Sequence, residues 1–238
     1  MFGQTKPVVD YCHSDLEEKG FEPLIFHATG LGGRIMEGLV EDSMIAGIID
    51  VTTTEIADAI FDGVFSAGNT RLTAAGKKGI PHVVVPGCMD MVNFGSKETI
   101  LEKYRERQLY YSKPTVTLMR TTPDENWKIG KMVADNLRDA NPVKTVVVLP
   151  LKGISRFDSE GCKFWNPEAD KALFESLKTH LNPEIPVIEV DMHINDNTFG
   201  DLLLEELYRI IGYTPEYDSK THVPDQISEV LTKAKNKL

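Results

Sequence analysis

Short apolar runs alternate with amphipathic stretches along most of the chain. The apolar runs predict strands at residues 23–26, 45–51, 83–85, 115–119, 146–149 and 187–190. Apolar residues three or four apart predict helices that begin near residues 5, 33, 55, 97, 122, 166 and 199. Strands that are apolar throughout and alternate with helices are typical of a parallel sheet covered on both faces. The pattern predicts a doubly wound, Rossmann-like α/β fold, with a mainly parallel sheet of about six strands and helices on both faces.

Three of the expected helices carry recognisable start signals. Thr5 stands two positions before Pro7, and Asn166 directly precedes Pro167. Thr122 and Glu125 form a Ser/Thr-x-x-Glu capping box that contains a proline at the first helical position. These signals predict where three of the helices begin.

The chain has 238 residues, enough for one domain with a sizeable core. We expect a single α/β domain over residues 1–213, because strand and helix patterns alternate without a break up to that point. Residues 214–238 then change composition, and Ile227, Val230 and Leu231 are spaced as on a helix. They predict a C-terminal tail with one helix.

Charge and cysteine usage limit the class of protein. The 26 Lys and Arg residues against 36 Asp and Glu residues give a net charge of −10, which disfavours nucleic-acid binding. No apolar stretch is long enough for a membrane span, and no signal peptide is indicated. The three cysteines are scattered, without metal-ligand spacing, as in proteins of a reducing cytoplasm. We therefore expect a cytoplasmic protein that binds neither nucleic acid nor membrane.

Polar side chains gather just after the expected strands rather than before them. They lie at His27–Gly33, Thr52–Glu55, Gly87–Asp90, Arg120–Thr122, Lys152–Arg156 and His193–Asp196. Ligands of open parallel sheets bind beyond the carboxyl ends of the strands. This asymmetry predicts one ligand site at the carboxyl edge of the sheet.

A glycine-rich loop connects the first expected strand to the next helix. Glycines at 30, 32 and 33 would let backbone N–H groups approach an anion at the helix N-terminus, and Thr29 and Arg34 flank them. The spacing of Gly30, Gly32 and Gly33 matches neither the dinucleotide fingerprint nor a Walker loop. The loop is interpreted as an anion site, with a tight turn that serves helix–strand packing as the alternative.

Further ligand-binding candidates come from hydroxyl and basic side chains. Thr52, Thr53 and Thr54 offer three hydroxyls where one helix cap would need only one, although capping alone remains an alternative. Guanidinium and ammonium groups that could hold a phosphate or carboxylate follow later strands. They are Arg120, Lys152 and Arg156, in addition to Arg34.

Four residues at the same edge could transfer protons: His27, Glu55, Asp90 and His193. For each a structural role stays open, as a buried histidine, a helix-end charge or a turn residue. Asp191 and His193 could share a sheet face, but no third ligand has a fixed spacing, so no metal site is assigned and a metal requirement stays open.

Several ordered motifs resemble a known family. They are HATGLGGRIME at 27–37, DVTTTEIAD at 50–58, GCMDMVNFG at 87–95, TLMRTT at 117–122, LPLKG at 149–153 and DMHIND at 191–196. The chain resembles, from Phe2 to Tyr213, the second half of a poorly characterised, mostly bacterial family also found in plants. That family shares an ATP-binding region with a plant protein that blocks tobamovirus replication.

The resemblance implies ATP as a cofactor, with binding mainly by the family's first half as the alternative. Contacts made by that first half are not carried over to any residue here. In the family this region usually follows another α/β half, and the chain starts near that junction. We expect either a first-half subunit or a homodimer as partner.

The leading hypothesis is an α/β protein that binds a small anion, a nucleotide phosphate or an organic acid, and whose catalytic activity is open. The alternative is a non-catalytic, nucleotide-gated interaction or inhibitor module.

Overall fold

The computed structural model describes residues 1–214, so the expected tail helix lies outside the described residues. The helices are α1 (Lys6–Glu18), α2 (Leu31–Glu41), α3 (Glu55–Ile60), α4 (Thr73–Lys78), α5 (Pro123–Asn136), α6 (Pro167–His180) and α7 (Asn197–Ile211), with 3-10 turns η1 (Lys97–Thr99) and η2 (Glu102–Tyr104). The strands are β1 (Ile48–Thr52), β2 (His82–Gly87), β3 (Met91–Phe94), β4 (Leu109–Lys113), β5 (Val116–Arg120), β6 (Thr145–Pro150) and β7 (Val187–Val190).

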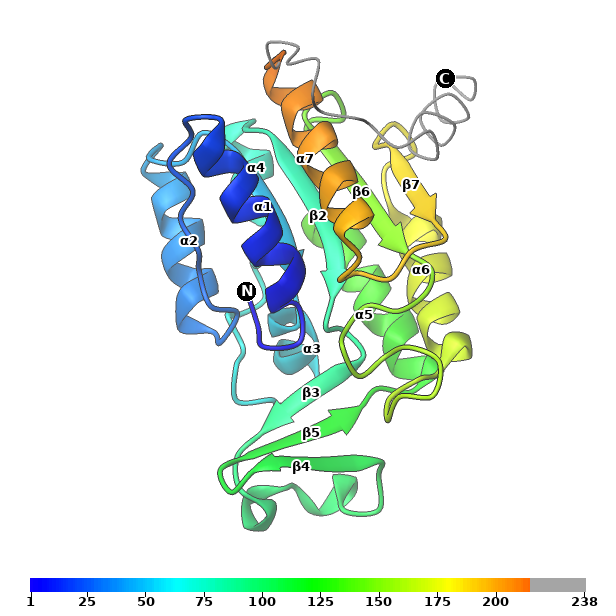
Figure 1. Cartoon of the computed structure of the whole chain (residues 1–238). Helices are drawn as coiled ribbons and strands as arrows, with labels where there is room; N and C mark the ends of the chain where they lie inside the picture. The colour runs from blue at the N-terminus through cyan, green and yellow to red at the C-terminus, as the bar shows by residue number, and fades with distance from the viewer. Residues whose placement is uncertain (215–238) are drawn as a thin grey trace.

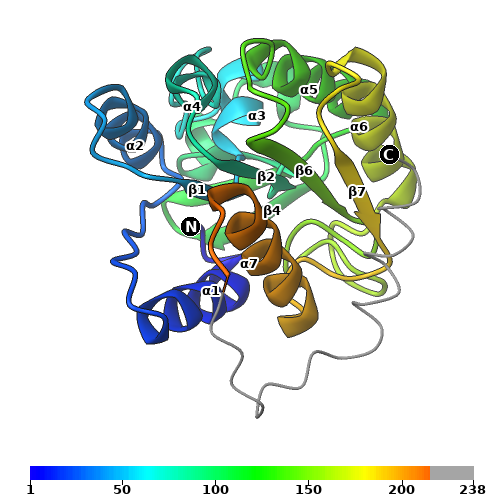
Figure 2. The same ribbon diagram turned by 90° about the horizontal axis from the view of Figure 1, so that it is seen from above.

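The main sheet has four parallel strands in the order β1-β2-β6-β7. Figure 2 shows α1 and α7 on one face of this sheet and the other helices on the opposite face. Alternate residues of β2 serve the two faces, because successive side chains of a strand point in opposite directions. Val83 and Val85 pack in the cluster of α1 and α7, whereas Val84 packs in that of α5 and α6. The expected doubly wound α/β class is confirmed.

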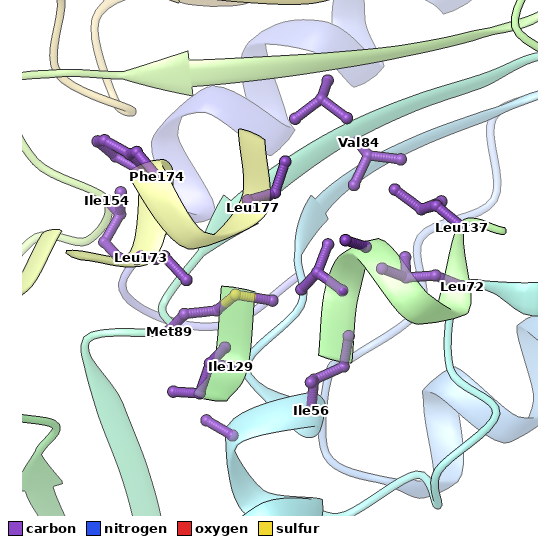
Figure 3. Packing of buried hydrophobic residues seen from close by; sticks show 14 of the residues in the cluster. Ile56, Leu72, Val84, Met89, Ile129, Leu137, Ile154, Leu173, Phe174 and Leu177 are labelled. Atoms are coloured by element: carbon purple, nitrogen blue, oxygen red, sulfur yellow. The ribbon is translucent and has the colours of Figure 1, made fainter. Parts of the chain in front are cut away.

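The larger core lies between the sheet and α3, α5 and α6 (Figure 3). Ile129, Val133 and Leu173 are fully buried there. The helices α5 and α6 approach closely at Gly130, where an added Cβ would lie only 2.5 Å from the carbonyl oxygen of Leu173. This close packing fixes the helices that follow β5 and precede β7.

The main sheet has four strands rather than about six, because two expected strands are not part of it. Residues 115–119 form β5 in a separate antiparallel sheet, in the order β3-β5-β4, which lies beyond the carboxyl edge of the main sheet (Figure 1). Residues 23–26 form no strand, and Leu24 and Ile25 are 63% and 39% exposed. An apolar run predicts a strand, but it does not show whether another strand pairs with it or whether that pairing is parallel or antiparallel.

The helix expected at residues 97–107 is also absent, and η1 and η2 take its place. Ile100 and Tyr104 of this segment are buried and pack in the same cluster as Phe94 of β3. The apolar spacing that predicts one helix therefore belongs to two short turns.

Two of the three helix-start signals are confirmed. The Thr122–Glu125 capping box forms at α5, and the Asn166 side chain accepts from the N–H of Ala169. Thr5 stands at the start of α1, but its hydroxyl does not cap that helix.

No helix within residues 1–214 is long and apolar enough to cross a membrane.

Candidate functional site

The segments that follow the parallel strands lie side by side at the carboxyl edge of the sheet, as the sequence predicts. The N–H of Thr53 donates to the carbonyl of Gly87 (3.1 Å), and the N–H of Cys88 donates to that of Ile154 (2.9 Å). The loop after β6 is joined in turn to the segment after β7, because the N–H of Ile194 donates to Gly153 (3.1 Å). A row of connected backbones therefore forms this edge.

The glycine-rich loop binds an anion from within the protein. The N–H groups of Gly30 and Gly33 donate to Oε1 of Glu55 at 2.7 and 3.2 Å. Glu55 is fully buried, and its other oxygen accepts from Nε of Arg71 (2.8 Å). The positive end of α2 is thus paired with the first residue of α3, as expected for amides at a helix N-terminus. Binding of an external anion by this loop stays a prediction.

The conformation of the loop explains two of its glycines. Gly30 has φ 81°, in the region that favours glycine. An added Cβ at Gly32 would lie 1.9 Å from the carbonyl oxygen of His27, so the turn closes only without a side chain. The turn precedes α2 directly, although no strand precedes it.

Arg71 is the centre of a buried charge cluster that the sequence pattern does not reveal. Its guanidinium pairs with both oxygens of Asp50 at 2.6 Å, with Glu55, and with Glu37 at 3.2 Å. Burial alone would raise the pKa of Asp50, but attraction by Arg71, its two hydrogen bonds and the nearby His82 ring hold that pKa below its ordinary value. The partners are far apart along the chain, so no local spacing could have identified the cluster.

The three threonines after β1 are buried and their hydroxyls are engaged. The hydroxyl of Thr52 lies 2.7 Å from that of Thr5, the hydroxyl of Thr53 donates to Val85 (2.8 Å), and that of Thr54 donates to the carbonyl of Met91 (3.3 Å). None of them caps α3. Their observed role is to join this turn to α1 and to the neighbouring strands.

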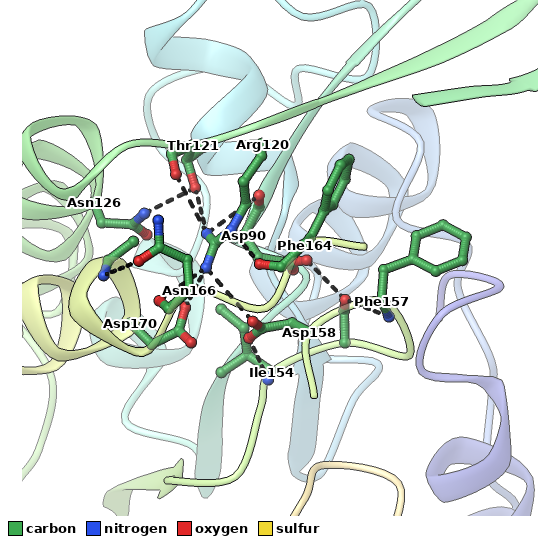
Figure 4. Close-up of polar contacts among 12 residues, drawn as sticks. Asp90, Arg120, Thr121, Asn126, Ile154, Phe157, Asp158, Phe164, Asn166 and Asp170 are labelled. Carbon is green, nitrogen blue, oxygen red and sulfur yellow. Dashed lines mark hydrogen bonds and ion pairs between the residues drawn. The ribbon is translucent and has the colours of Figure 1, made fainter. Parts of the chain in front are cut away.

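Arg120 lies in the interior of the protein, whereas the sequence predicts that it contacts a ligand. It ends β5 of the antiparallel sheet, is 2% exposed, and donates to the carbonyl of Phe164 (2.7 Å) and to Asp170 (2.7 Å), with Asp158 at 3.5 Å (Figure 4). Its charge therefore compensates buried carboxylates rather than facing solvent. The expectation that Arg120 follows a strand of the main sheet is wrong, because β5 belongs to the other sheet. Ligand binding by Arg120 stays a prediction.

Asp90 belongs to the same interior cluster. One carboxylate oxygen accepts from the Ser155 hydroxyl (2.7 Å), and the other has no hydrogen-bond partner among residues 1–214. Burial raises the pKa of Asp90, and the nearby charge of Asp158 raises it further against the attraction of Arg120. Asp90 can therefore hold a proton near neutral pH, inside the protein. In the described part of the chain, no group of three or more Asp, Glu, His or Cys residues could hold a metal ion.

The remaining candidates reach the surface of the carboxyl edge. His27, Arg34, Lys152 and Arg156 are exposed, and Thr29 is half-buried. Arg34 donates to the carbonyl of Ser66 (2.9 Å), and Lys152 pairs with Asp191 (2.9 Å).

His193 is half-buried, and its ring is held between two backbones. Nδ1 accepts from the N–H of Asn195 (3.1 Å), so Nε2 carries the proton that it donates to the carbonyl of Ser155 (2.9 Å). This arrangement places His193 beside the loop that carries Arg156.

The start of α1 lies among these surface groups. The carbonyl of Gln4 accepts from the N–H of Arg156 (3.1 Å) and from Nδ2 of Asn195 (2.9 Å), and Thr5 bonds to Thr52. No side chain caps α1. Its N-terminus therefore lies at the carboxyl edge, between the turn after β1 and the loop after β6. Sequence reasoning missed this helix end because it read Thr5 as a cap.

These features define a doubly wound α/β protein whose polar loops converge at the carboxyl edge of a parallel sheet. Residues 1–211 match the C-terminal domain of the uncharacterised protein family UPF0261, and the chain belongs to that family. A UPF0261 protein of Clostridium tetani is 45% identical over 212 residues, which are 89% of this chain and 52% of that protein.

A UPF0261 protein of Rhizobium meliloti is 41% identical, over 84% of this chain and 50% of its own length. The ToMV resistance protein Tm-1 of Solanum lycopersicum is also 41% identical, over 88% of this chain and 28% of its own length. The chain therefore spans about half the length of these bacterial relatives. The family expected from the ordered motifs is confirmed.

Proposed function

We propose that the chain binds a small anion, a nucleotide phosphate or an organic acid, at the carboxyl edge of its parallel sheet. The observation that carries this proposal is the uncapped N-terminus of α1 beside the exposed Arg156. Backbone N–H groups and the helix dipole favour negative charge at such an end, and a guanidinium adds a planar pair of donors. Lys152 and His193 lie on the adjoining loops.

ATP is the first ligand to test, because the motif resemblance implies it for the family. A triphosphate has the negative charge that this edge would receive. We further propose a cytoplasmic location and the second part of a two-part protein as the working form. The relatives' extra length supports that arrangement.

The geometry favours binding over catalysis by the groups first considered. Glu55 and Asp90 are fully buried, and Glu55 is occupied by the glycine loop and by Arg71. His27 and His193 reach the edge, so we propose them as the groups for any proton transfer. Both ring nitrogens of His193 are bonded to backbone groups, so proton transfer by His193 would require its Nε2–H to leave the carbonyl of Ser155.

A second function, an interaction or inhibitor module, is favoured by exposed apolar side chains. Leu31 and Ile35, one turn apart on α2, are 60% and 47% exposed, and Leu24 and Ile25 precede them. The relative named as a ToMV resistance protein supports this reading. Such a module could carry the same anion site as its switch.

Calorimetric titration of the chain with ATP, inorganic phosphate and citrate, with and without Mg²⁺, tests the proposal. Arg156→Ala should weaken the binding of at least one of these anions by about 1.5–3 kcal/mol, the typical value of a hydrogen bond to a charged group. Arg138→Ala is the matched control, because Arg138 is exposed and lies before β6 rather than after it. Equal loss in both variants, or no binding of any anion, would contradict the proposal.

A further inference from the structure

A cavity of about 760 Å³ runs along the free side of β1. The strand β1 forms one wall and the extended segment at residues 21–28 forms the other. Val9 and Cys12 of α1 and Leu207 of α7 line one face, while Met36 of α2 lies on the opposite face. We call this cavity the β1 slot. It has the walls and the two helix-covered faces of a strand position in a parallel sheet.

The edge strand presents unpaired backbone to the β1 slot. The N–H of Ile48 donates to the carbonyl of Pro81 (2.9 Å), so the backbone groups of Ile48 point toward β2. Backbone direction alternates along a strand, so the N–H and C=O of Ile49 point into the slot. Edge strands with such free groups accept a further strand unless they are covered. The exposed lysine or proline that would block this edge is absent from β1.

The first residue already bonds as a member of such a strand. The amino group of Met1 donates to the carbonyl of Phe26 (2.6 Å), and the N–H of Ala28 donates to the carbonyl of Met1 (2.8 Å). This is the bonding of a parallel ladder between Met1 and residues 26–28. An amide N–H at the Met1 nitrogen would make the same bond without burying a charge, and burial lowers the pKa of the present amine.

The order of elements agrees with this interpretation. A strand in the β1 slot would be followed by α1, the segment at 23–28, α2 and β1. The spatial order would then be segment 23–28, slot strand, β1, β2 and β6, which is the 2-1-3-4-5 order of flavodoxin-like doubly wound sheets. In Figure 2 the N-terminus lies beyond β1, between α2 and α7, where that strand would end.

We propose that the β1 slot receives a short apolar β-strand, parallel to β1, from the polypeptide that makes up the rest of the longer relatives. This inference rests on the proposed two-part organisation but not on the anion site. The occupant must be a strand, because Ile49 turns its backbone groups into the slot on one side, and Phe26 and Ala28 on the other side already pair with Met1 as in a parallel ladder. It must be apolar on both faces, because helices cover both. A strand of about five residues matches the length of β1.

The test is amide hydrogen exchange of Ile49 in the full chain, extended before Met1 by Lys-Ile-Val-Ile-Val-Thr. Protection of the Ile49 amide should rise on the order of tenfold or more, since tethering gives the strand a high local concentration. The control extension, Lys-Pro-Val-Pro-Val-Thr, lacks two donors and should leave Ile49 unchanged. Equal protection with both extensions, or with neither, would overturn the strand assignment.

The donor is tested separately, with the unextended chain and the remaining part of the Clostridium tetani relative supplied in trans. Added polypeptide should protect Ile49 and form a complex of one copy each. Protection that rises with the concentration of this chain alone would assign the slot to a second copy and refute the proposed donor. Loss of anion binding in the Arg156→Ala variant, with Ile49 still protected, would separate the two proposals.

Discussion

Replacing Glu55 by glutamine tests whether this residue holds the structure together or transfers protons. Its carboxylate is fully buried and accepts from Gly30, Gly33 and Arg71. Glutamine can still accept from the two glycines through its oxygen. Its amide nitrogen would then face Nε of Arg71, now 2.8 Å from a carboxylate oxygen, so that two donors would meet.

The magnitude follows from these contacts. One charge-assisted hydrogen bond is lost, at about 1.5–3 kcal/mol, and Nε of Arg71 is left unsatisfied, at about 1–3 kcal/mol. Arg71 retains both oxygens of Asp50, which keeps its charge compensated. We expect Glu55→Gln to lower the free energy of unfolding by about 3–5 kcal/mol, the usual effect of breaking a buried ion pair.

Urea unfolding followed by far-UV circular dichroism measures this loss. Glu41→Gln is the matched control, since Glu41 is an exposed glutamate at the end of α2, and should change stability by less than about 0.5 kcal/mol. A loss below about 1 kcal/mol for Glu55→Gln, with an unchanged denaturant slope, would refute this reasoning. A fall in turnover of roughly 10²–10⁴-fold in a stable variant would instead identify a general base.

Three further changes have expected outcomes. Burial raises the pKa of Asp58 to about 7, so the folded state binds this proton more tightly than the unfolded state, and stability should fall as pH rises from about 4 to 7. Asp58→Asn should flatten this pH dependence, measured by urea unfolding at several pH values. An unchanged pH dependence would contradict the role of Asp58. Arg120→Met should destabilise by about 3–5 kcal/mol in thermal unfolding because Asp170 loses its partner, and a neutral effect would refute this. Gly33→Ala should destabilise the protein, because the added Cβ would lie 2.4 Å from a carboxylate oxygen of the buried Glu55. Gly38→Ala on the same helix meets no atom within 4 Å and should stabilise by about 0.5–1 kcal/mol. Equal effects of the two substitutions would contradict the contact between Gly33 and Glu55.

The sequence predicts those strands and helix starts that a short local pattern of residues defines. The strands β1, β2, β6 and β7 are fully or partly buried apolar runs, and all four were predicted within a few residues of their observed bounds. The capping box at Thr122 is equally local. The run at 115–119 was correctly predicted as a strand but placed in the wrong sheet. It pairs antiparallel with β3, which follows β2, and with β4, and an apolar run does not show these partners.

The candidate site was predictable only as a region. The carboxyl edge follows from the order of strands and polar loops, and His27, Arg156 and His193 lie there as expected. Which charges are buried together does not follow, because Arg71 meets Asp50 across 21 positions and Arg120 meets Asp170 across 50. Apolar spacing carries no information about such long-range pairs, so the interior position of Arg120 could not be anticipated.

The most direct test of the central claim is the amide spectrum of the isotopically labelled chain during titration with ATP and, separately, with inorganic phosphate. Binding at the carboxyl edge predicts saturable shifts of the Lys6, Val8 and Arg156 amides, at the first turn of α1 and the adjoining loop. The Val143 amide, before β6 at the opposite edge, should remain unchanged. Saturable shifts confined to other parts of the chain, or none with either anion, would contradict the claim.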